Sequence, residues 1–274
     1  MYANPAEAPQ RAPVTLPQLR EKKRKGEKIV VVTAYDASFA AQTDAAGIDV
    51  VLVGDSLGMV VQGQATTLPV TLDHMVYHSA AVARGLRSAL LIADMPFMTY
   101  ASPERAYEGA ARLMGEGGAA MVKIEGAVWT NEIIARLSER DVPVCAHLGL
   151  TPQSVHKLGG YRVQGRDRVQ ADHLLREALN VAQAGAELLV LECVPAALAA
   201  RITAEIPIPT IGIGAGVDCD GQVLVMYDLL GITPGKRPRF TKDFLVGRGS
   251  VVEALSAYAS AVRSGEFPAL EHSF

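Results

Sequence analysis

The stretch Val50-Val51-Leu52-Val53-Gly54-Asp55-Ser56 decides the fold, because a short run of aliphatic residues ends abruptly in side chains that can do chemistry. Five further apolar runs end in the same way, at Tyr35-Asp36, Asp94, Lys123-Ile124-Glu125, His147 and Glu192. Continuous apolar runs of this length are typical of parallel strands that are buried on both faces. Strands that end one after another in polar residues indicate the catalytic rim of a parallel barrel, where those side chains converge.

Strand-like and helix-like patterns alternate along the rest of the chain. The expected strands lie near residues 29–35, 50–55, 89–94, 119–125, 143–148, 188–193, 209–214 and 222–226, and the expected helices near residues 15–27, 38–46, 72–86, 103–116, 130–140, 171–185, 195–204 and 243–263. Eight strands interleaved with helices favour a single (β/α)8 TIM-type barrel with an N-terminal helix, an α/β fold that spans residues 15–274. An open, doubly wound parallel sheet is the alternative, because closure of a sheet leaves no mark in the sequence.

The size and composition of the chain agree with one large aliphatic core. Its 274 residues suit a single (β/α)8 barrel, which typically has about 250 residues. Aromatic residues make up only 5% of the chain, so the 49% that is hydrophobic must build the core mainly from aliphatic side chains, as parallel sheets do. The net charge of -3 argues against a general nucleic-acid binder or a protein of anionic membrane surfaces.

The termini and cysteines predict a cytoplasmic protein. No apolar run approaches the roughly 20 residues that a membrane-spanning helix needs. Residues 1–14 are rich in Ala and Pro and lack the apolar core of a signal peptide, and we expect them to form a disordered extension. Cys145, Cys193 and Cys219 are odd in number and lack CxxC spacing, which favours reduced and buried thiols.

The charged residues at the expected rim predict a metal site. Lys123 and Glu125 are two residues apart on one strand, so both side chains point to the same side. Asp55 and Asp94 add two more carboxylates, and one lysine cannot balance all three acids. A divalent cation would supply the missing charge, and oxygen ligands suit Mg2+ or Mn2+ better than Zn2+. The alternatives are a simple Lys123–Glu125 ion pair, and a role for Asp55 or Asp94 as a cap or turn residue.

Other residues near the rim are candidates for binding and catalysis. Glu192, at the end of the sixth expected strand, is a candidate general base. His147 ends the fifth expected strand and could donate to a substrate oxygen, act as a base, or serve the fold alone. Cys193 adjoins Glu192, but strand alternation directs its side chain away from the barrel interior.

Two segments between the expected elements have both a functional and a structural interpretation. Gly212-Ile213-Gly214-Ala215-Gly216 follows the seventh expected strand, where the backbone N–H groups of many barrels bind anions. Glycines at that place also simply permit a tight turn. Residues 151–170 form a long connection after the fifth expected strand, and this length favours a lid or a loop that contacts substrate.

Nine segments, taken in order, closely resemble the ketopantoate hydroxymethyltransferase family. The resemblance runs from about Thr15 to Phe274, and nine matches in the right order are specific where any one alone is weak. The segments that carry it are Thr33-Ala34-Tyr35-Asp36, Val53-Gly54-Asp55-Ser56-Leu57-Gly58, Thr67-Leu68-Pro69-Val70-Thr71, Ala93-Asp94-Met95-Pro96-Phe97-Met98, Val122-Lys123-Ile124-Glu125-Gly126, His147-Leu148-Gly149-Leu150-Thr151-Pro152-Gln153-Ser154, Gly159-Gly160-Tyr161, Leu191-Glu192-Cys193-Val194-Pro195 and Ile211-Gly212-Ile213-Gly214-Ala215-Gly216.

The resemblance implies a reaction and a set of partners. It implies a (β/α)8 barrel that transfers a hydroxymethyl group from 5,10-methylenetetrahydrofolate to 3-methyl-2-oxobutanoate, giving 2-dehydropantoate on the route to pantothenate. By the same resemblance, Mg2+ or another divalent cation would be the cofactor, and ten copies of the chain would assemble as a homodecamer.

The resemblance also assigns roles to residues that match the motifs of the family. Asp55, Asp94 and Glu125 would surround Mg2+, directly or through water. Asp55, Ser56, Asp94 and Lys123 would contact the keto acid. From its position at the same rim, and not from the resemblance, His147 is a further candidate to bind it. Glu192 would accept the proton that the keto acid loses.

Two rival functions are left open. One is another Mg2+-dependent 2-oxo-acid aldolase or carbon–carbon lyase on a similar barrel, although the Lys-Lys-Cys-Gly-His loop of the isocitrate lyase and phosphoenolpyruvate mutase type is absent from this sequence. The other is a non-catalytic barrel that binds an anion at residues 212–216. The sequence does not identify the residues that contact the folate.

Overall fold

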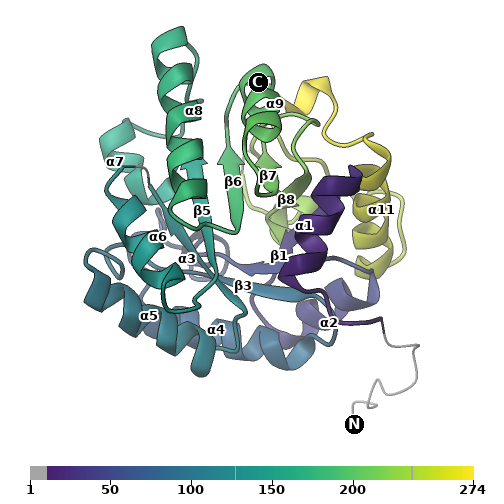
Figure 1. Ribbon diagram of the computed structural model, residues 1–274. Coiled ribbons are helices and arrows are strands. Elements are labelled where there is room, and N and C mark those ends of the chain that lie inside the picture. Colours follow the sequence, from purple (N-terminus) through teal and green to yellow (C-terminus); the bar gives the residue numbers. More distant parts are fainter. Residues whose placement is uncertain (1–10, 127, 236) are drawn as a thin grey trace.

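The fold is a closed barrel of eight parallel strands, each hydrogen-bonded to its sequence neighbours (Figure 1). The computed structural model describes residues 11–126, 128–235 and 237–274. Strand β8 pairs with β1, with Val30 opposite Gln222, so the predicted barrel is confirmed and the open sheet is wrong. The strands are β1 (Ile29–Thr33), β2 (Val50–Val53), β3 (Leu90–Asp94), β4 (Met121–Glu125), β5 (Val144–Gly149), β6 (Leu188–Glu192), β7 (Thr210–Ile213) and β8 (Gly221–Leu224).

Helices follow the strands and cover the outside of the barrel. The helices are α1 (Leu16–Lys25), α2 (Ala37–Ala45), α3 (Leu57–Val60), α4 (Leu72–Gly85), α5 (Pro103–Gly115), α6 (Thr130–Ser138), α7 (Val155–Leu158), α8 (Arg168–Gln183), α9 (Ala196–Glu205), α10 (Met226–Leu229) and α11 (Val251–Ser264), with 3-10 turns η1 (Pro152–Ser154) and η2 (Leu270–His272). Every predicted helix is present, but the last begins at Val251 and not near residue 243. The Ser250 hydroxyl caps it by accepting from Glu253 N, and Gly247 and Gly249 precede that cap.

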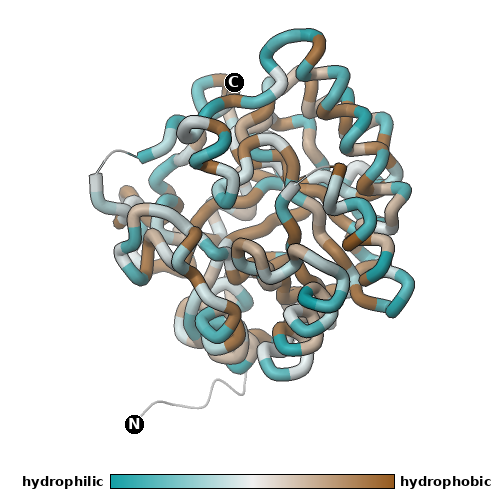
Figure 2. Tube along the Cα trace, turned by 90° about the vertical axis from the view of Figure 1, so that its left-hand side faces the viewer, coloured by the Kyte–Doolittle hydropathy of each residue, from teal (hydrophilic) through white to brown (hydrophobic). Residues whose placement is uncertain are grey.

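The hydrophobic core has two layers, which alternation along the strands separates. Side chains such as Val31, Ile92 and Val190 fill the inside of the barrel, while neighbours such as Val30 and Val51 pack outward against the helices. Figure 2 shows hydrophobic segments, in brown, gathered toward the centre of the molecule. The inner layer is almost entirely aliphatic, so the charged residues at the carboxyl ends of the strands stand on a low-polarity floor.

Helix α1 closes the amino end of the barrel. Leu19 is 1% exposed and belongs to the same cluster as the inner barrel residues. The segment before α1 is anchored too, since Val14 N donates to the Ser88 carbonyl at 2.7 Å and Arg11 lies 3.6 Å from Asp49. Most of the predicted disordered extension, residues 1–10 of 1–14, lies outside the described residues. None of the described helices combines the length and the apolar character needed to cross a bilayer.

Candidate active site

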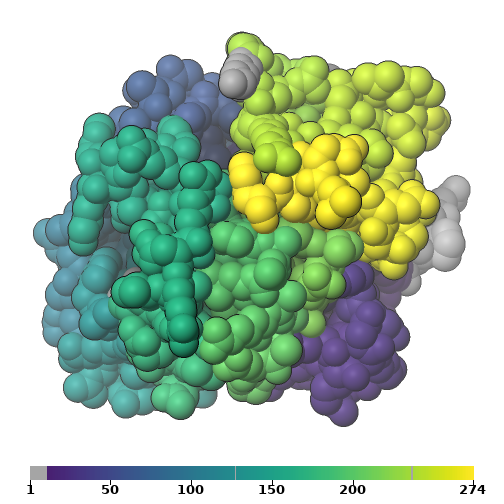
Figure 3. Space-filling view, turned by 90° about the horizontal axis from the view of Figure 1, so that it is seen from above, coloured from purple at the N-terminus to yellow at the C-terminus, as the bar shows by residue number. Residues whose placement is uncertain are grey.

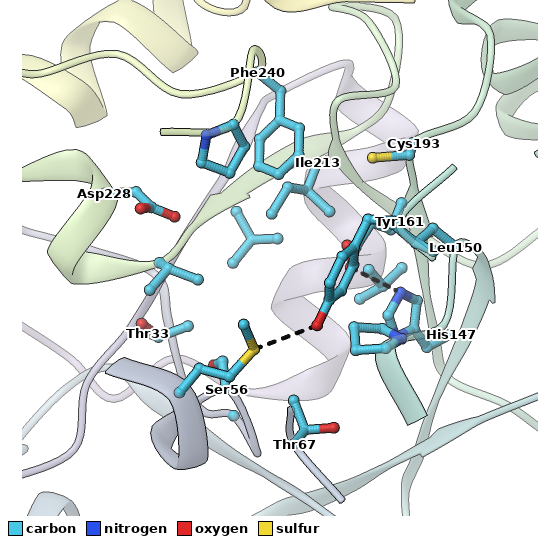
Figure 4. Close-up of a pocket in the computed structure, with 18 of the residues that line it drawn as sticks. Thr33, Ser56, Thr67, His147, Leu150, Tyr161, Cys193, Ile213, Asp228 and Phe240 are labelled. Atoms are coloured by element: carbon cyan, nitrogen blue, oxygen red, sulfur yellow. Dashed lines mark hydrogen bonds and ion pairs between the residues drawn. The ribbon is translucent and has the colours of Figure 1, made fainter. Parts of the chain in front are cut away.

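A chamber with a cavity volume of about 1250 Å3 opens at the carboxyl ends of the strands (Figure 4). The structure brings every predicted site residue to its wall: Asp55, Ser56, Asp94, Lys123, Glu125, His147 and Glu192. Asp94, Lys123, Glu125 and Glu192 are the last or near-last residues of their strands, and Asp55 follows β2 after one glycine. The pattern of polar strand ends therefore identified one continuous site.

Lys123 is the cation at the centre of the site. Its Nζ lies 2.5 Å from Asp94 Oδ1 and 3.6 Å from Glu125 Oε1, and the residue is 4% exposed. Burial alone would lower the pKa of Lys123, but the carboxylates of Asp94, Glu125 and Asp55 outweigh it and raise the pKa above its ordinary value. Lys123 is therefore charged at neutral pH, and its tighter partner is Asp94, not Glu125 as in a simple pair along one strand.

Asp55 and Asp94 are two buried acids beside this lysine. Asp55 N donates to Asp94 Oδ2 at 2.9 Å, and Asp55 Oδ2 accepts from Gln153 Nε2 at 2.9 Å. Burial, the Asp94 charge and then the Glu125 charge raise the pKa of Asp55 well above its ordinary value. The Asp55 carboxylate caps no described helix, so the alternative of a cap residue does not hold. One lysine leaves these acids short of positive charge.

His147 links two carboxylates on the neighbouring strands. Its Nδ1 lies 3.2 Å from Glu125 Oε1 and its Nε2 lies 3.3 Å from Glu192 Oε2. Burial and Lys123 alone would lower the pKa of His147, but Glu125 and Glu192 raise it to about 9. The same contacts act in the opposite sense on Glu125, whose pKa is lowered below its ordinary value by His147 and Lys123 although burial opposes this. The pair is therefore an imidazolium and a carboxylate at neutral pH.

The alignment of His147 leaves one of its protons available to a ligand. The buried Nε2 has no hydrogen bond of good geometry among the described residues, although Glu192 is close. Glu192 itself is less enclosed than the other acids, with 15% of its side chain exposed toward the chamber. A base that faces the open space and a donor beside it can act on a bound substrate.

Gln153 is a site residue that sequence reasoning missed as an individual. It lies in η1 after β5, is 6% exposed, and donates through Nε2 to Asp55 and to the Met95 carbonyl at 3.0 Å. Its backbone N–H donates to Glu125 Oε2 at 3.0 Å, and its Oε1 accepts from the Tyr100 hydroxyl at 2.6 Å. Because Gln153 lies outside a strand, the pattern of polar strand ends could not predict its contacts with the two acids. Only the family motif Thr151-Pro152-Gln153-Ser154 drew attention to its segment.

The end of β6 turns sharply at Cys193. This residue has a φ of 49°, and it lines the chamber with its sulfur toward the cavity (Figure 4). The expectation that alternation directs Cys193 away from the interior is therefore wrong, because the strand pattern stops at Glu192. Gly149 permits the close approach of β5 here, since a Cβ on it would lie 2.3 Å from the Glu192 carbonyl oxygen. Burial raises the pKa of the Cys193 thiol, which keeps it protonated and a poor nucleophile.

The long connection after β5 covers part of the chamber, as the sequence predicted. The Tyr161 hydroxyl donates to the sulfur of Met59 at 3.5 Å, which spans the opening toward α3 (Figure 4). Gln164 N donates to the Cys193 carbonyl at 2.9 Å and ties the connection to β6. Tyr161 is 53% exposed, so it forms an outer wall of the chamber and not part of its floor.

The glycines after β7 lie close to other parts of the chain. A Cβ on Gly214 would lie 3.0 Å from the Phe240 ring and 3.1 Å from the Phe274 ring, and one on Gly216 would lie 2.6 Å from the Ala196 Cβ. The C-terminal segment is held there because Ala196 N donates to the Phe274 carbonyl at 2.9 Å, and Figure 3 shows that segment, in yellow, against the green segments before it. These neighbours occupy the space in front of Gly214 and Gly216, so the structure favours a packing role for the two glycines over an anion cradle.

The comparisons with known proteins agree with this geometry. The model of the family described as ketopantoate hydroxymethyltransferase matches residues 13–270. The chain is 59% identical over 264 residues to a protein of Alkalilimnicola ehrlichii named 3-methyl-2-oxobutanoate hydroxymethyltransferase, covering 96% of this chain and 95% of the relative. A protein of Nitrosococcus oceani with the same name is 56% identical and is covered over 99% of its length, against 95% of this chain.

A solved structure extends the likeness at the level of the fold. Phosphoenolpyruvate phosphomutase from Streptomyces platensis subsp. rosaceus superposes with a TM-score of 0.60 at 16% identity, covering 79% of this chain and 82% of that chain. At this identity the likeness concerns the barrel alone. The match over nearly the whole sequence and the site that the structure assembles lead to one conclusion: this chain belongs to the ketopantoate hydroxymethyltransferase family.

Proposed function

We propose that the chain transfers a hydroxymethyl group from 5,10-methylenetetrahydrofolate to 3-methyl-2-oxobutanoate, giving 2-dehydropantoate for pantothenate synthesis. The names of the relatives support the transfer and the acceptor. The observation that carries the proposal is the arrangement of one buried rim, in which acids short of positive charge lie beside the His147–Glu192 pair. A 2-oxo acid needs both parts, one to bind its oxygens and one to remove its C3 proton.

The donor set at Asp55 and Asp94 fits Mg2+. The Asp94 carboxylate accepts from the backbone N–H of Asp55, both acids offer oxygen ligands, and burial and the Asp94 charge raise the pKa of Asp55, an effect that a hard cation would relieve. The described residues contain no group of three or more His, Cys, Asp or Glu side chains set closely enough to hold a metal, and the Glu125 oxygens already accept from His147 and Gln153 N. Asp94 is engaged as well, by Lys123 and by Asp55 N, so Asp55, Asp94 and Glu125 would surround the ion directly or through water.

The bound ion would polarise the keto group and stabilise the negative charge that develops on its oxygen. Lys123 adds a second positive charge at the same place. Ser56 is positioned as a further contact for the acid, because its hydroxyl lies 2.9 Å from the Tyr35 hydroxyl and its orientation is thereby restricted. These residues orient the keto acid with its reactive carbon toward the open side of the chamber.

Glu192 is the residue we propose as the base. It removes the proton from C3, and the positive charge of the neighbouring His147, 3.3 Å away, favours the ionised form of its carboxylate. The C3 carbanion, stabilised as the enolate, then forms a bond to the methylene carbon of the folate as the bond from that carbon to one of its two folate nitrogens breaks, and this nitrogen takes up the proton removed from C3. Water then supplies the hydroxyl group to the same carbon as its bond to the second nitrogen breaks. The second nitrogen takes the remaining proton of the water, and tetrahydrofolate leaves.

Deuterium exchange at C3 of 3-methyl-2-oxobutanoate tests the proposal. We expect exchange with solvent in the absence of folate, and 2-dehydropantoate only when 5,10-methylenetetrahydrofolate is added. Cleavage of a 2-oxo or 2-hydroxy acid without folate would instead favour the aldolase or lyase function. The cytoplasmic location and the homodecamer stay predictions from the sequence and the family resemblance.

A further inference from the structure

The chamber contains a buried acid that the reaction described above does not use. Asp228 lies on α10, directly after β8, and is 7% exposed. Figure 4 shows its carboxylate directed into the cavity from the side opposite His147. The keto-acid residues come from β2, β3 and β4 and the base from β6, so Asp228 faces the part of the chamber beside β7, β8 and β1 that those residues leave free.

Apolar side chains share the part of the chamber that Asp228 faces. Ile213 and Phe240 lie there in Figure 4, and Val225 also lines the chamber. The cavity of about 1250 Å3 exceeds the roughly 300–1000 Å3 of common ligand sites, and a five-carbon keto acid fills only a small part of it. The free part therefore suits a larger ligand with a planar ring, which would pack against Phe240 and Ile213.

The hydrogen bonding of Asp228 is incomplete. Its Oδ1 accepts from the Thr233 hydroxyl at 2.6 Å, and no described residue donates to its Oδ2. Burial raises the pKa of Asp228, while Thr233 and Arg237 offset part of that effect. The Oδ2 atom is not among the fully enclosed polar atoms that lack a partner, so it opens to the chamber, where a ligand or water can complete its hydrogen bonding. The missing partner is a donor, since an ionised carboxylate only accepts.

We propose that Asp228 binds the 2-amino group and N3–H of the pterin ring of the folate, so that this part of the chamber is the pterin subsite. The inference rests on the proposed function, which supplies the folate. The two N–H groups lie side by side on one edge of the ring and match the two oxygens of a carboxylate. The second ring, which carries the one-carbon unit, then lies on the far side from Asp228, toward the keto acid.

The route for the rest of the folate is consistent with this orientation. Arg237 and Arg239 line the outer part of the chamber and are exposed, although Arg237 also pairs with Asp243 at 3.1 Å. Arg239 also donates to the Glu271 carbonyl at 2.9 Å, and both side chains stay exposed, so either could attract glutamyl carboxylates that emerge from the chamber. The competing role for Asp228 is purely structural, as the acceptor that fixes Thr233 in the turn after α10.

Asp228→Asn tests the assignment, because the amide keeps the shape and cannot accept from both ring donors. We expect the KM for 5,10-methylenetetrahydrofolate to rise about 10- to 100-fold, the range for losing a hydrogen bond to a charged group. Folate-independent deuterium exchange at C3 should continue at the wild-type rate. Asp218→Asn, an exposed acid before β8 that does not line the chamber, is the matched control and should leave both measurements unchanged.

Binding of tetrahydrofolate and of its analogue without the 2-amino group separates recognition from folding. By fluorescence titration, the wild type should prefer tetrahydrofolate about tenfold and Asp228→Asn should lose the preference. Thr233→Val removes the protein donor to Asp228 but leaves its carboxylate in place, so we expect this variant to keep the preference for tetrahydrofolate. It tests the assignment even if Asp228→Asn does not fold. Loss of the preference in Thr233→Val, its retention in Asp228→Asn, or a parallel loss of C3 exchange would overturn the pterin subsite.

The proposed function fails differently. If the wild type makes no 2-dehydropantoate from 5,10-methylenetetrahydrofolate, the folate reaction itself is wrong and the subsite fails with it. If the wild type does so and Asp228→Asn keeps its KM, only the role of Asp228 is wrong.

Discussion

Replacing Lys123 by Met isolates the charge balance on which the site depends. The substitution keeps an aliphatic stem of similar length and removes a cation that lies 2.5 Å from Asp94 and 3.6 Å from Glu125. At an effective dielectric constant of about 20, these two attractions amount to roughly 7 and 5 kcal/mol before desolvation is subtracted. Because removing one partner of a buried ion pair leaves an uncompensated charge, we expect a net loss of about 3–5 kcal/mol in the free energy of unfolding.

Metal should reverse part of this loss. In Lys123→Met the negative charges of Asp55 and Asp94 are no longer balanced by a lysine. Added Mg2+ should therefore bind beside these two carboxylates. We therefore expect Mg2+ to raise the stability of Lys123→Met more than that of the wild type. Urea unfolding of both proteins, in a chelator and in excess Mg2+, measures the two differences.

Lys28→Met is the matched control. Lys28 donates to the carbonyl oxygens of Val217 and Cys219 at 2.7 and 2.6 Å, so its loss removes hydrogen bonds but leaves no carboxylate without its cation. We expect a cost of about 1–3 kcal/mol and no added response to Mg2+. The proposed charge balance would be refuted if Lys123→Met were as stable as the wild type in chelator, or if Mg2+ did not raise its free energy of unfolding.

Three further predictions follow from the site. Glu192→Gln should abolish C3 exchange while the affinity for the keto acid, measured by calorimetry, stays within about threefold of wild type, because the amide cannot accept the proton; undiminished exchange would remove Glu192 from the role of base. Chelation of divalent cations should stop C3 exchange and Mg2+ should restore it, and Asp94→Asn should weaken Mg2+-dependent binding of the keto acid; a chelated protein that exchanges at the untreated rate would contradict the metal proposal. Since the pKa of His147 is about 9 in the folded chain and about 6.5 in an unfolded one, its protonation stabilises the fold fully below pH 6.5, and this contribution is lost as the pH rises through 9. The stability difference between the wild type and His147→Gln should therefore shrink by an order of 3 kcal/mol between pH 6 and pH 10, and a difference that does not change with pH would show that His147 is neutral.

The sequence predicted the barrel because parallel strands carry two independent marks. Each strand is mostly apolar and polar residues stand at or just after its end. The expected strands 50–55 and 188–193 were therefore found, although β2 ends two residues earlier at Val53 and β6 one residue earlier at Glu192. Closure itself was not predictable, since it depends on β8 pairing with β1 through residues such as Gln222 that carry no pairing code.

The parts of the site that were missed lie on irregular backbone. Gln153 sits in a 3-10 turn, Asp228 lies on a four-residue helix, and Cys193 is turned by a positive φ. No period of two or of 3.6 residues extends through these segments, so their direction cannot be derived from spacing. Alternation is reliable only within the hydrogen-bonded part of a strand.

Helix α1, which places Leu19 at the amino end of the barrel, has a consequence for the order of binding. Because α1 seals that end, ligands reach the described part of the barrel from the opposite mouth, and the residues proposed to hold the keto acid lie deeper than the outer wall formed by Tyr161. Under the proposed function, a folate bound nearer the mouth would cover the keto acid. The keto acid would then bind first, and tetrahydrofolate would leave before 2-dehydropantoate.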